Sequence, residues 1–221
     1  ILLEQRIDIL HAHIFTAALW GRFAARRAGT RVVIQHEHST HTLDAWWRTA
    51  LDRVFCRWST RIVAVSEDLR QRFLQAGYPQ EKLLLIRNGI RTERYATEAD
   101  ASGARQRLGL SAEAAVVAIV GSLEPRKDHR MFFHALARAA TQVQRPLVAL
   151  IVGHGPLRQE LEQAAKSIEG VACRFLGQLT DVRDALWASD LYVSSSITEG
   201  TSLAMLEAMA AGVPVVATAV G

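Results

Sequence analysis

The sequence contains only two cysteines, Cys56 and Cys173, among its 221 residues. They lie far apart and lack the spacing of a metal-binding or redox pair, so we expect two buried thiols in a reducing compartment. No apolar run approaches the roughly 20 residues that a membrane-spanning helix requires. The longest runs, 114–121 and 147–153, have the length of buried strands.

Lysine is also scarce, with three among 26 cationic residues, and the charge is unevenly distributed. Residues 1–97 hold 15 Lys/Arg against 9 Asp/Glu, whereas residues 98–221 hold 11 against 13. A basic first half can favour an anionic acceptor or an anionic membrane surface, but simple surface solubility of an arginine-rich protein accounts for it more readily. Basic clusters are too few to predict binding to nucleic acid.

The order of the elements predicts an α/β protein, because short apolar runs alternate with amphipathic stretches throughout the chain. Four strands are expected before a polar segment at 96–110 and five after it. We therefore expect a domain over 1–95, an interdomain linker over 96–110 and a second domain over 111–221. The chain begins with Ile1 rather than Met and stops directly after an apolar run, so we expect a fragment truncated at both ends.

The expected elements follow from the apolar runs and from cap residues such as Ser66. Strands are predicted at 7–11, 31–35, 62–65, 82–86, 115–120, 147–152, 173–176, 191–194 and 214–218. Helices are predicted at 16–28, 44–60, 66–75, 130–141, 157–167, 181–188 and 202–211.

The stretch 190–218 has the strongest chemical signal. A buried strand leads into a serine-rich loop with Glu199, and Gly200, Thr201 and Ser202 open a helix that carries Glu207. A helix N-terminus that follows a glycine presents free N–H groups and a partial positive charge, which suit a phosphate. We therefore expect the two carboxylates to contact different parts of one nucleotide-sugar.

This stretch resembles the donor site of the retaining GT-B glycosyltransferases of family four, the glycosyl transferases group one. Glu199 and Glu207 match the E-x7-E motif of that family. Further matches occur in order along the chain, at 8–13, 62–67, 85–90, 120–127, 152–156 and 175–177. The resemblance implies two Rossmann-like α/β domains, both incomplete here, with the acceptor on the N-terminal domain and the donor on the C-terminal one.

The resemblance also assigns roles to single residues. Glu199 would contact the donor sugar and Glu207 its ribose, while Gly200, Thr201 and Ser202 would offer N–H groups to the diphosphate. Lys127 would neutralise the leaving diphosphate, which makes a metal unnecessary and agrees with the absence of an Asp-x-Asp triplet. The implied donor-binding set also includes Gly121, Ser122, Gln178 and Leu179.

One position departs from the family pattern, because Ser122 stands where an arginine is common. A serine cannot supply a guanidinium fork to a phosphate, and we predict that the neighbouring Arg126 compensates. His154 likewise replaces a common acidic residue, which limits the expected role of its loop to a tight backbone approach.

Five of the eight histidines lie in the first 41 residues. His11 and His13 fall on one face of a strand, so a metal site must be weighed, but no carboxylate or cysteine cluster completes it. We expect no metal. By resemblance, His38 would face the donor sugar as a catalytic residue, and His13 would line the same cleft or support a loop.

The stretch 46–58 combines tryptophans with arginines. Such a pattern is typical of a helix with one core face and one solvated arginine face. It also suits an interfacial membrane contact that serves a lipid-linked acceptor.

We thus expect a metal-independent retaining hexosyltransferase of cell-surface glycan, polysaccharide or glycolipid synthesis, using a UDP- or GDP-sugar and no cofactor. It would be cytoplasmic, with a peripheral position on the inner face of the plasma membrane as an option, and a weak catalyst as this fragment. A non-catalytic nucleotide-sugar-binding module remains an alternative. An NAD-dependent oxidoreductase is a further one, although the loop at Gly153 lacks the third glycine of the dinucleotide fingerprint.

Overall fold

The computed structural model describes residues 2, 4–95 and 100–220. The chain divides into two compact units. The first contains the residues up to Asn88 together with Thr198–Thr201, and the second contains Gly89–Ile197 and Ser202–Val220. Each unit has its own parallel sheet and its own apolar core.

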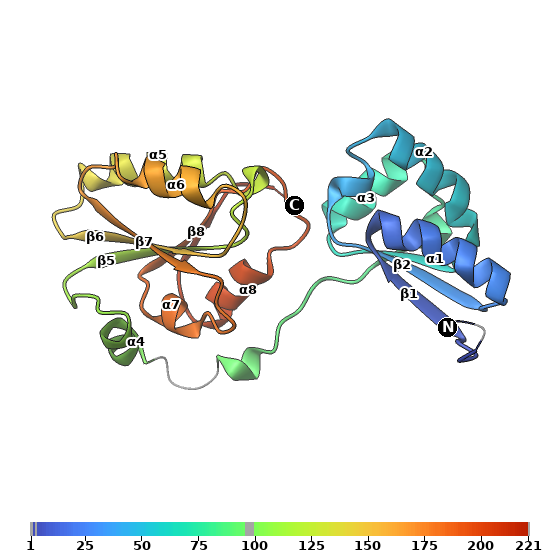
Figure 1. The fold of residues 1–221 in the computed structure, drawn as a ribbon, viewed down its shortest axis with the longest axis horizontal. Helices are drawn as coiled ribbons and strands as arrows, with labels where there is room; N and C mark the ends of the chain where they lie inside the picture. Colours follow the sequence, from blue (N-terminus) through green and yellow to red (C-terminus); the bar gives the residue numbers. More distant parts are fainter. Residues whose placement is uncertain (1, 3, 96–99, 221) are drawn as a thin grey trace. The chain divides into compact units, whose positions relative to one another are not determined.

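The sheet of the first unit has four parallel strands in the order β1-β2-β3-β4. Because each crossover steps to the next strand in the same direction, the right-handed rule places the connecting helices on one face, as Figure 1 shows. The elements are β1 (Ile9–His13), α1 (Ile14–Ala28), β2 (Val32–Glu37), η1 (Thr40–Thr42), α2 (Trp46–Phe55), η2 (Cys56–Trp58), β3 (Arg61–Ala64), α3 (Glu67–Gln75), η3 (Gln80–Lys82) and β4 (Leu83–Leu85).

Two of the three buried, helix-facing residues of β2, Gln35 and Glu37, are polar where an apolar core is usual. Arg22 on α1 is fully buried and forms an ion pair with the equally buried Asp52 on α2, with Nη1 and Oδ1 2.6 Å apart. Gln35 accepts a hydrogen bond from Arg22 and donates to Asp52 Oδ2 at 3.0 Å and to Glu37 Oε1 at 2.8 Å. The Tyr78 hydroxyl also donates to Asp52 Oδ2, at 2.8 Å. These groups form a continuous buried network that joins α1, α2 and β2.

The second unit has a five-stranded parallel sheet in the order β7-β6-β5-β8-β9. The chain first moves outward from β5 and then returns to its other side at β8, so the strand order reverses between these two strands. The strands are β5 (Ala115–Val120), β6 (Leu147–Val152), β7 (Val171–Gly177), β8 (Leu191–Ser194) and β9 (Val215–Ala217). Ligands of open α/β sheets bind at the carboxyl ends of the strands, at such a reversal.

Helices cover both faces of this second sheet (Figure 1). Phe132 on α5 and Leu161 on α6 pack on one face, and Ala185 on α7 and Ala208 on α8 pack on the other. The bounds are η4 (Thr92–Arg94), α4 (Ala101–Arg107), η5 (Pro125–Lys127), α5 (His129–Ala140), α6 (Arg158–Ala165), α7 (Arg183–Trp187) and α8 (Leu203–Ala210).

The strand counts of four and five agree with the prediction from sequence, but the predicted linker differs. Residues 96–99 lie outside the described residues, and residues 101–107 form α4 within the second unit. Ala104 of this helix is fully buried, and Arg105 pairs with Asp190 at 2.9 Å. The polar composition of the segment gave no sign of this short helix, which is anchored by ion pairs as well as by the packing of Ala104 in the core.

Both cysteines are free thiols. Cys56 is buried as expected, whereas Cys173 on β7 is only half-buried. None of the helices in the described part of the chain combines the length and apolarity needed to cross a membrane.

Candidate functional site

The carboxyl ends of β5, β6 and β7 bring three glycine loops together. The Gly121 N–H donates to Val152 O at 2.9 Å, and the Gly153 N–H donates to Gly177 O at 2.8 Å. Gly153 has a φ of 144°, and a Cβ there would lie 1.8 Å from Gly121 O. Because backbone fills this space, only glycine fits, so the tight backbone approach predicted for this loop is present.

A cavity of about 260 Å³ opens at this edge of the sheet. Four residues of the predicted donor-binding set line it, namely Gly121, Ser122, Gln178 and Leu179. Its remaining lining is Val120, Val152, Gly153, His154 and Val182. Glycine backbone beside apolar walls and a few polar side chains is the usual composition of a small-molecule site.

Lys127 ends the short helix η5, which follows β5. Its Cε lies 3.3 Å from the position that a Cβ on Gly121 would occupy, so the side chain runs over the end of β5. The hydroxyl of Ser195 donates to Lys127 O and Asp128 O, each at 2.9 Å. The loop after β8 therefore holds the backbone that carries Lys127.

Asp128 completes this turn. Its φ is 44°, in the left-handed region, and its carboxylate caps α5 by accepting from the Met131 N–H at 3.1 Å. A capping aspartate tolerates this conformation because its short polar side chain bonds locally. The cap fixes the direction in which the chain leaves Lys127.

His129 is a site residue that the sequence did not single out. It is 2% exposed, and neither ring nitrogen has a partner among the described residues. Burial, and then the charge of Lys127, lower the pKa of His129 to about 4, so the ring is neutral near pH 7. A cavity of about 10 Å³, the size of one water, is lined by His129, Lys127 and Ser194–Ser196. The adjacency of His129 to Lys127 was the available signal.

Arg126 lies beside the serine that departs from the family pattern. Its Nη2 is 3.4 Å from Ser122 Oγ, and its Nε donates to Glu124 Oε2 at 3.0 Å. The guanidinium therefore lies beside Ser122 and Glu124 in the loop that follows β5. Its predicted contact with a phosphate stays a prediction.

Glu207 lies in α8, whose N-terminus is capped by Ser202 accepting from the Met205 N–H at 3.4 Å. Glu207 is half-buried and accepts a hydrogen bond from Tyr95. The pKa of Tyr95 is raised to about 12, first by burial and then by the nearby Glu207, to which its hydroxyl donates. Glu199, Gly200 and Thr201 group with the first unit, so the predicted donor set divides between the two units.

His38 follows β2 in the first unit, and its Nε2 lies 2.8 Å from His13 Nδ1. Burial, and then the charges of His13 and His11, lower the pKa of His38. His38 thus belongs to a group of neighbouring histidine rings, and its proposed contact with the donor sugar stays a prediction.

The predicted core face of the tryptophan-rich helix is wrong. Trp46 is 83% exposed and Trp47 is 45% exposed. The buried residue of α2 is Asp52, because this helix faces the polar network of Arg22 rather than an apolar core. Phe55 and Trp58 are half-buried against Phe23.

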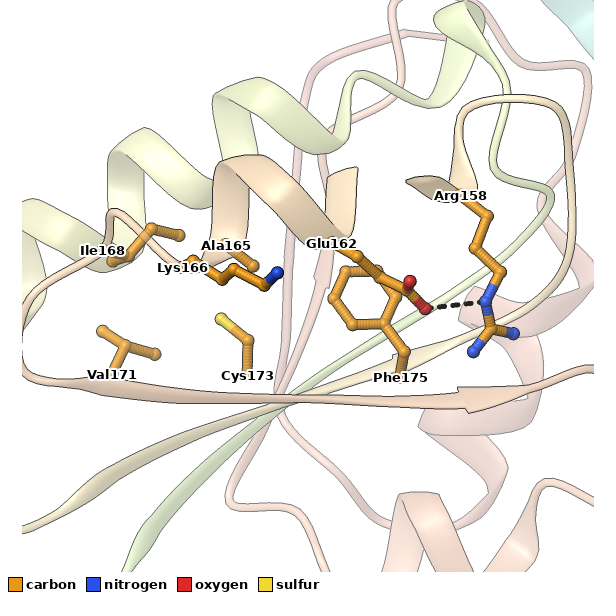
Figure 2. A pocket seen from close by; sticks show the side chains of 8 residues that line it. All are labelled: Arg158, Glu162, Ala165, Lys166, Ile168, Val171, Cys173 and Phe175. Atoms are coloured by element: carbon orange, nitrogen blue, oxygen red, sulfur yellow. Dashed lines mark hydrogen bonds and ion pairs between the residues drawn. The ribbon is translucent and has the colours of Figure 1, made fainter. Parts of the chain in front are cut away.

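A larger cavity of about 460 Å³ lies between α6 and the edge strand β7. Figure 2 shows Cys173 and Phe175 rising from β7 toward α6, with the Arg158–Glu162 ion pair at one end. The lining of this cavity includes no residue of the loops that follow β5 and β6, and none of the predicted site residues. We therefore place the candidate site at the smaller cavity.

Comparison with known proteins identifies the family of the chain. The model of the family Glycosyltransferase Family 4 matches residues 1–94, and that of Glycosyl transferases group 1 matches residues 114–221. The chain therefore belongs to the glycosyltransferases that these two family models describe. Its two parallel sheets have the GT-B architecture of the related structures.

Three relatives illustrate the likeness. The crystal structure of HepE from Anabaena in complex with UDP and glucose has a TM-score of 0.85 and 27% identity, covering 97% of this chain and 60% of that one. The UDP-Gal:alpha-D-GlcNAc-diphosphoundecaprenol alpha-1,3-galactosyltransferase of Escherichia coli is 28% identical over 97% of this chain and 58% of its own length.

The third relative is the GDP-mannose-dependent alpha-(1-6)-phosphatidylinositol monomannoside mannosyltransferase of Mycolicibacterium smegmatis. It is 33% identical over 87% of this chain and 53% of its own length. The chain thus spans between half and two thirds of the length of these relatives.

Proposed function

We propose that the protein transfers a sugar from a nucleotide-diphosphate-sugar to an acceptor hydroxyl with retention of configuration. The observation that carries the proposal is the cavity at the carboxyl ends of β5–β7, which is lined by Gly121, Ser122 and Gln178 and lies beside Lys127. Membership of the family and the complex of HepE with UDP and glucose support it.

The chemistry proposed for the second unit is electrostatic. As the bond between sugar and diphosphate breaks, negative charge develops on the phosphate oxygens, and Lys127 would neutralise it without a metal ion. The hydrogen bond from the Ser195 hydroxyl to Lys127 O holds the backbone of Lys127 in place before the reaction, so little reorganisation is needed. Glu207 would accept hydrogen bonds from the ribose, and the N–H groups at the start of α8 would bind phosphate.

Retention of configuration would follow from attack on the face that the leaving group vacates. Glu199 and His38 are proposed to contact the donor sugar in this step. The stereochemistry can be read by NMR from the anomeric signal of the first product formed from a UDP- or GDP-sugar panel. A product with the same anomeric configuration as the donor is expected, and an inverted product would contradict retention.

Arg126 is proposed to replace the missing phosphate-binding arginine. We expect Arg126→Ala to weaken donor binding by roughly tenfold, because a charge-assisted hydrogen bond is lost. Isothermal titration with UDP and GDP measures this. Glu124→Gln is the matched control, because it releases Arg126 from its ion pair without removing it, and should leave binding equal or tighter. Unchanged affinity in Arg126→Ala would refute the role.

The acceptor is proposed to be a glycan or lipid-linked hydroxyl in cell-surface polysaccharide or glycolipid synthesis, on the cytoplasmic side of the membrane. Relatives named for diphosphoundecaprenol and phosphatidylinositol substrates support this choice. A peripheral membrane contact through Trp46 and Trp47 would bring the protein to such an acceptor.

The membrane contact has a direct test. Because both indoles are exposed and Arg48 lies near the ring of Trp47, replacing Trp46 and Trp47 with alanine should reduce co-sedimentation with anionic vesicles by about tenfold. Replacing Met131, which is 49% exposed on α5 of the second unit, with alanine serves as the control. Equal sedimentation of the double variant and the parent would exclude this surface.

A further inference from the structure

Four histidines gather on the side of the first sheet that faces away from α1–α3. Ala12 on β1 and Val33, Gln35 and Glu37 on β2 are buried beneath these helices. Because successive side chains of a strand point to opposite faces, the alternate residues point to the other side. These are His11 and His13 from β1, with His36 from β2 and His38 directly after it.

The register of the strands brings the four rings together. β1 and β2 are parallel neighbours, and His13 stands opposite His36. His11 Nε2 lies 3.2 Å from His36 Nδ1, and His13 Nδ1 lies 2.8 Å from His38 Nε2. The ring centroids of His13 and His36 are 5.1 Å apart. Three of the four histidines, His11, His13 and His36, thus lie on two adjacent strands, and His38 follows the second strand.

Three of these residues have the arrangement of a metal site. One ring nitrogen each from His11, His13 and His36 lies within 4.8 Å of the other two. Zinc bonds to imidazole nitrogen at about 2.0–2.1 Å in a tetrahedral arrangement, which puts ligand nitrogens roughly 3.3 Å apart. Small rotations of the exposed His11 and His13 rings would bring the set to that spacing.

His36 supplies an independent indication. Its Nε2 is buried and has no hydrogen-bond partner among the described residues. A buried polar atom without a partner is costly, and a cation bound at Nε2 itself would remove that cost.

We propose that His11, His13 and His36 bind a divalent transition-metal ion of the zinc class, with His38 orienting His13 from behind. Three imidazoles leave the fourth position open to water, as in the three-histidine sites that zinc occupies in other proteins. A ligating histidine is usually held by a hydrogen bond from its second nitrogen, and the contact between His13 and His38 supplies one. His11 and His13 of β1 alone predict no metal site, whereas the third ligand comes from the neighbouring strand β2.

Binding of Zn²⁺ to the 221-residue chain, measured by isothermal titration at about pH 7.5 where imidazoles are neutral, tests the proposal. We expect one zinc ion per chain. His11→Gln and His36→Gln should each weaken binding by at least about tenfold. His134→Gln is the matched control, because His134 is exposed on α5 of the second unit, and it should bind zinc like the parent.

Cobalt gives a second readout that does not depend on affinity. Co²⁺ held by three imidazoles and water should show the visible absorption of a tetrahedral site, and His11→Gln should abolish it. His11 is exposed, so this variant is expected to keep its circular dichroism spectrum and melting temperature. Absence of zinc binding by the parent, or equal binding by His11→Gln and His36→Gln, would overturn the proposal.

Discussion

Replacing Lys127 with alanine should lower kcat/KM for a nucleotide-diphosphate-sugar by about 10²–10³-fold, the range found when a preorganised group that stabilises transition-state charge is removed. The amine extends over the end of β5 from a turn that is held by Ser195 and capped by Asp128. Water cannot replace a fixed positive charge at the leaving diphosphate. Nucleotide release with the preferred donor measures the effect.

Lys166→Ala is the matched control for this experiment. Lys166 is exposed after α6 and lines the cavity drawn in Figure 2 rather than the proposed donor site. Its replacement should leave kcat/KM within about twofold of the parent, since surface substitutions change little. A Lys127→Ala variant that folds normally and retains kcat/KM within the same range would contradict the role assigned to Lys127.

Replacing Asp52 with alanine should destabilise the first unit by about 3–5 kcal/mol, because it leaves the buried Arg22 guanidinium without its counter-ion. The loss also removes the acceptor of Tyr78 and of Gln35. Urea unfolding followed by tryptophan fluorescence suits this test. Four of the five tryptophans lie in residues 1–88, so the signal reports mainly on this unit.

Asp68→Ala provides the comparison for Asp52. Asp68 pairs with Arg72 at 2.7 Å on the surface of α3, where both side chains are more than a third exposed. An exposed pair of this kind contributes at most about 1 kcal/mol. We expect a far larger shift of the urea midpoint in Asp52→Ala, and equal shifts in the two variants would show that the buried pair does not stabilise the unit.

The strands of the second sheet could be predicted closely from sequence. The runs that end at Gly121 and Gly153 are apolar throughout and are buried on both faces, so β5 and β6 begin and end where expected. Helix ends were less accurate. The helix predicted over 44–60 is α2 followed by η2, because Cys56–Trp58 tighten into a 3-10 turn.

The polar interior of the first unit could not be predicted in the same way. Arg22, Gln35 and Asp52 lie in three different elements and read individually as surface residues. Only the packing of α1 and α2 over β2 turns them into one network. For the same reason the burial of α2 could not be predicted. Its exposed Trp46 and buried Asp52 reverse the usual preference of these residue types.

The candidate site was predictable where the backbone decides it and not where side chains from distant segments meet. Gly121, Ser122, Gln178 and Leu179 were expected together and share one cavity. His129 was missed, because its burial depends on the serine loop after β8, some 65 residues further along the chain. The contact of His36 with His11 depends on strand register, which no local pattern specifies.

Amide NMR of the isotope-labelled chain, titrated in parallel with UDP, GDP and NADH, tests most directly whether the loops at the carboxyl ends of β5–β7 bind a nucleoside diphosphate. We predict that UDP or GDP shifts the signals of Gly121, Ser122 and Gln178, and that NADH at the same concentration does not. Shifts confined to Cys173 and Phe175 at the other cavity, or a response to NADH alone, would contradict the account.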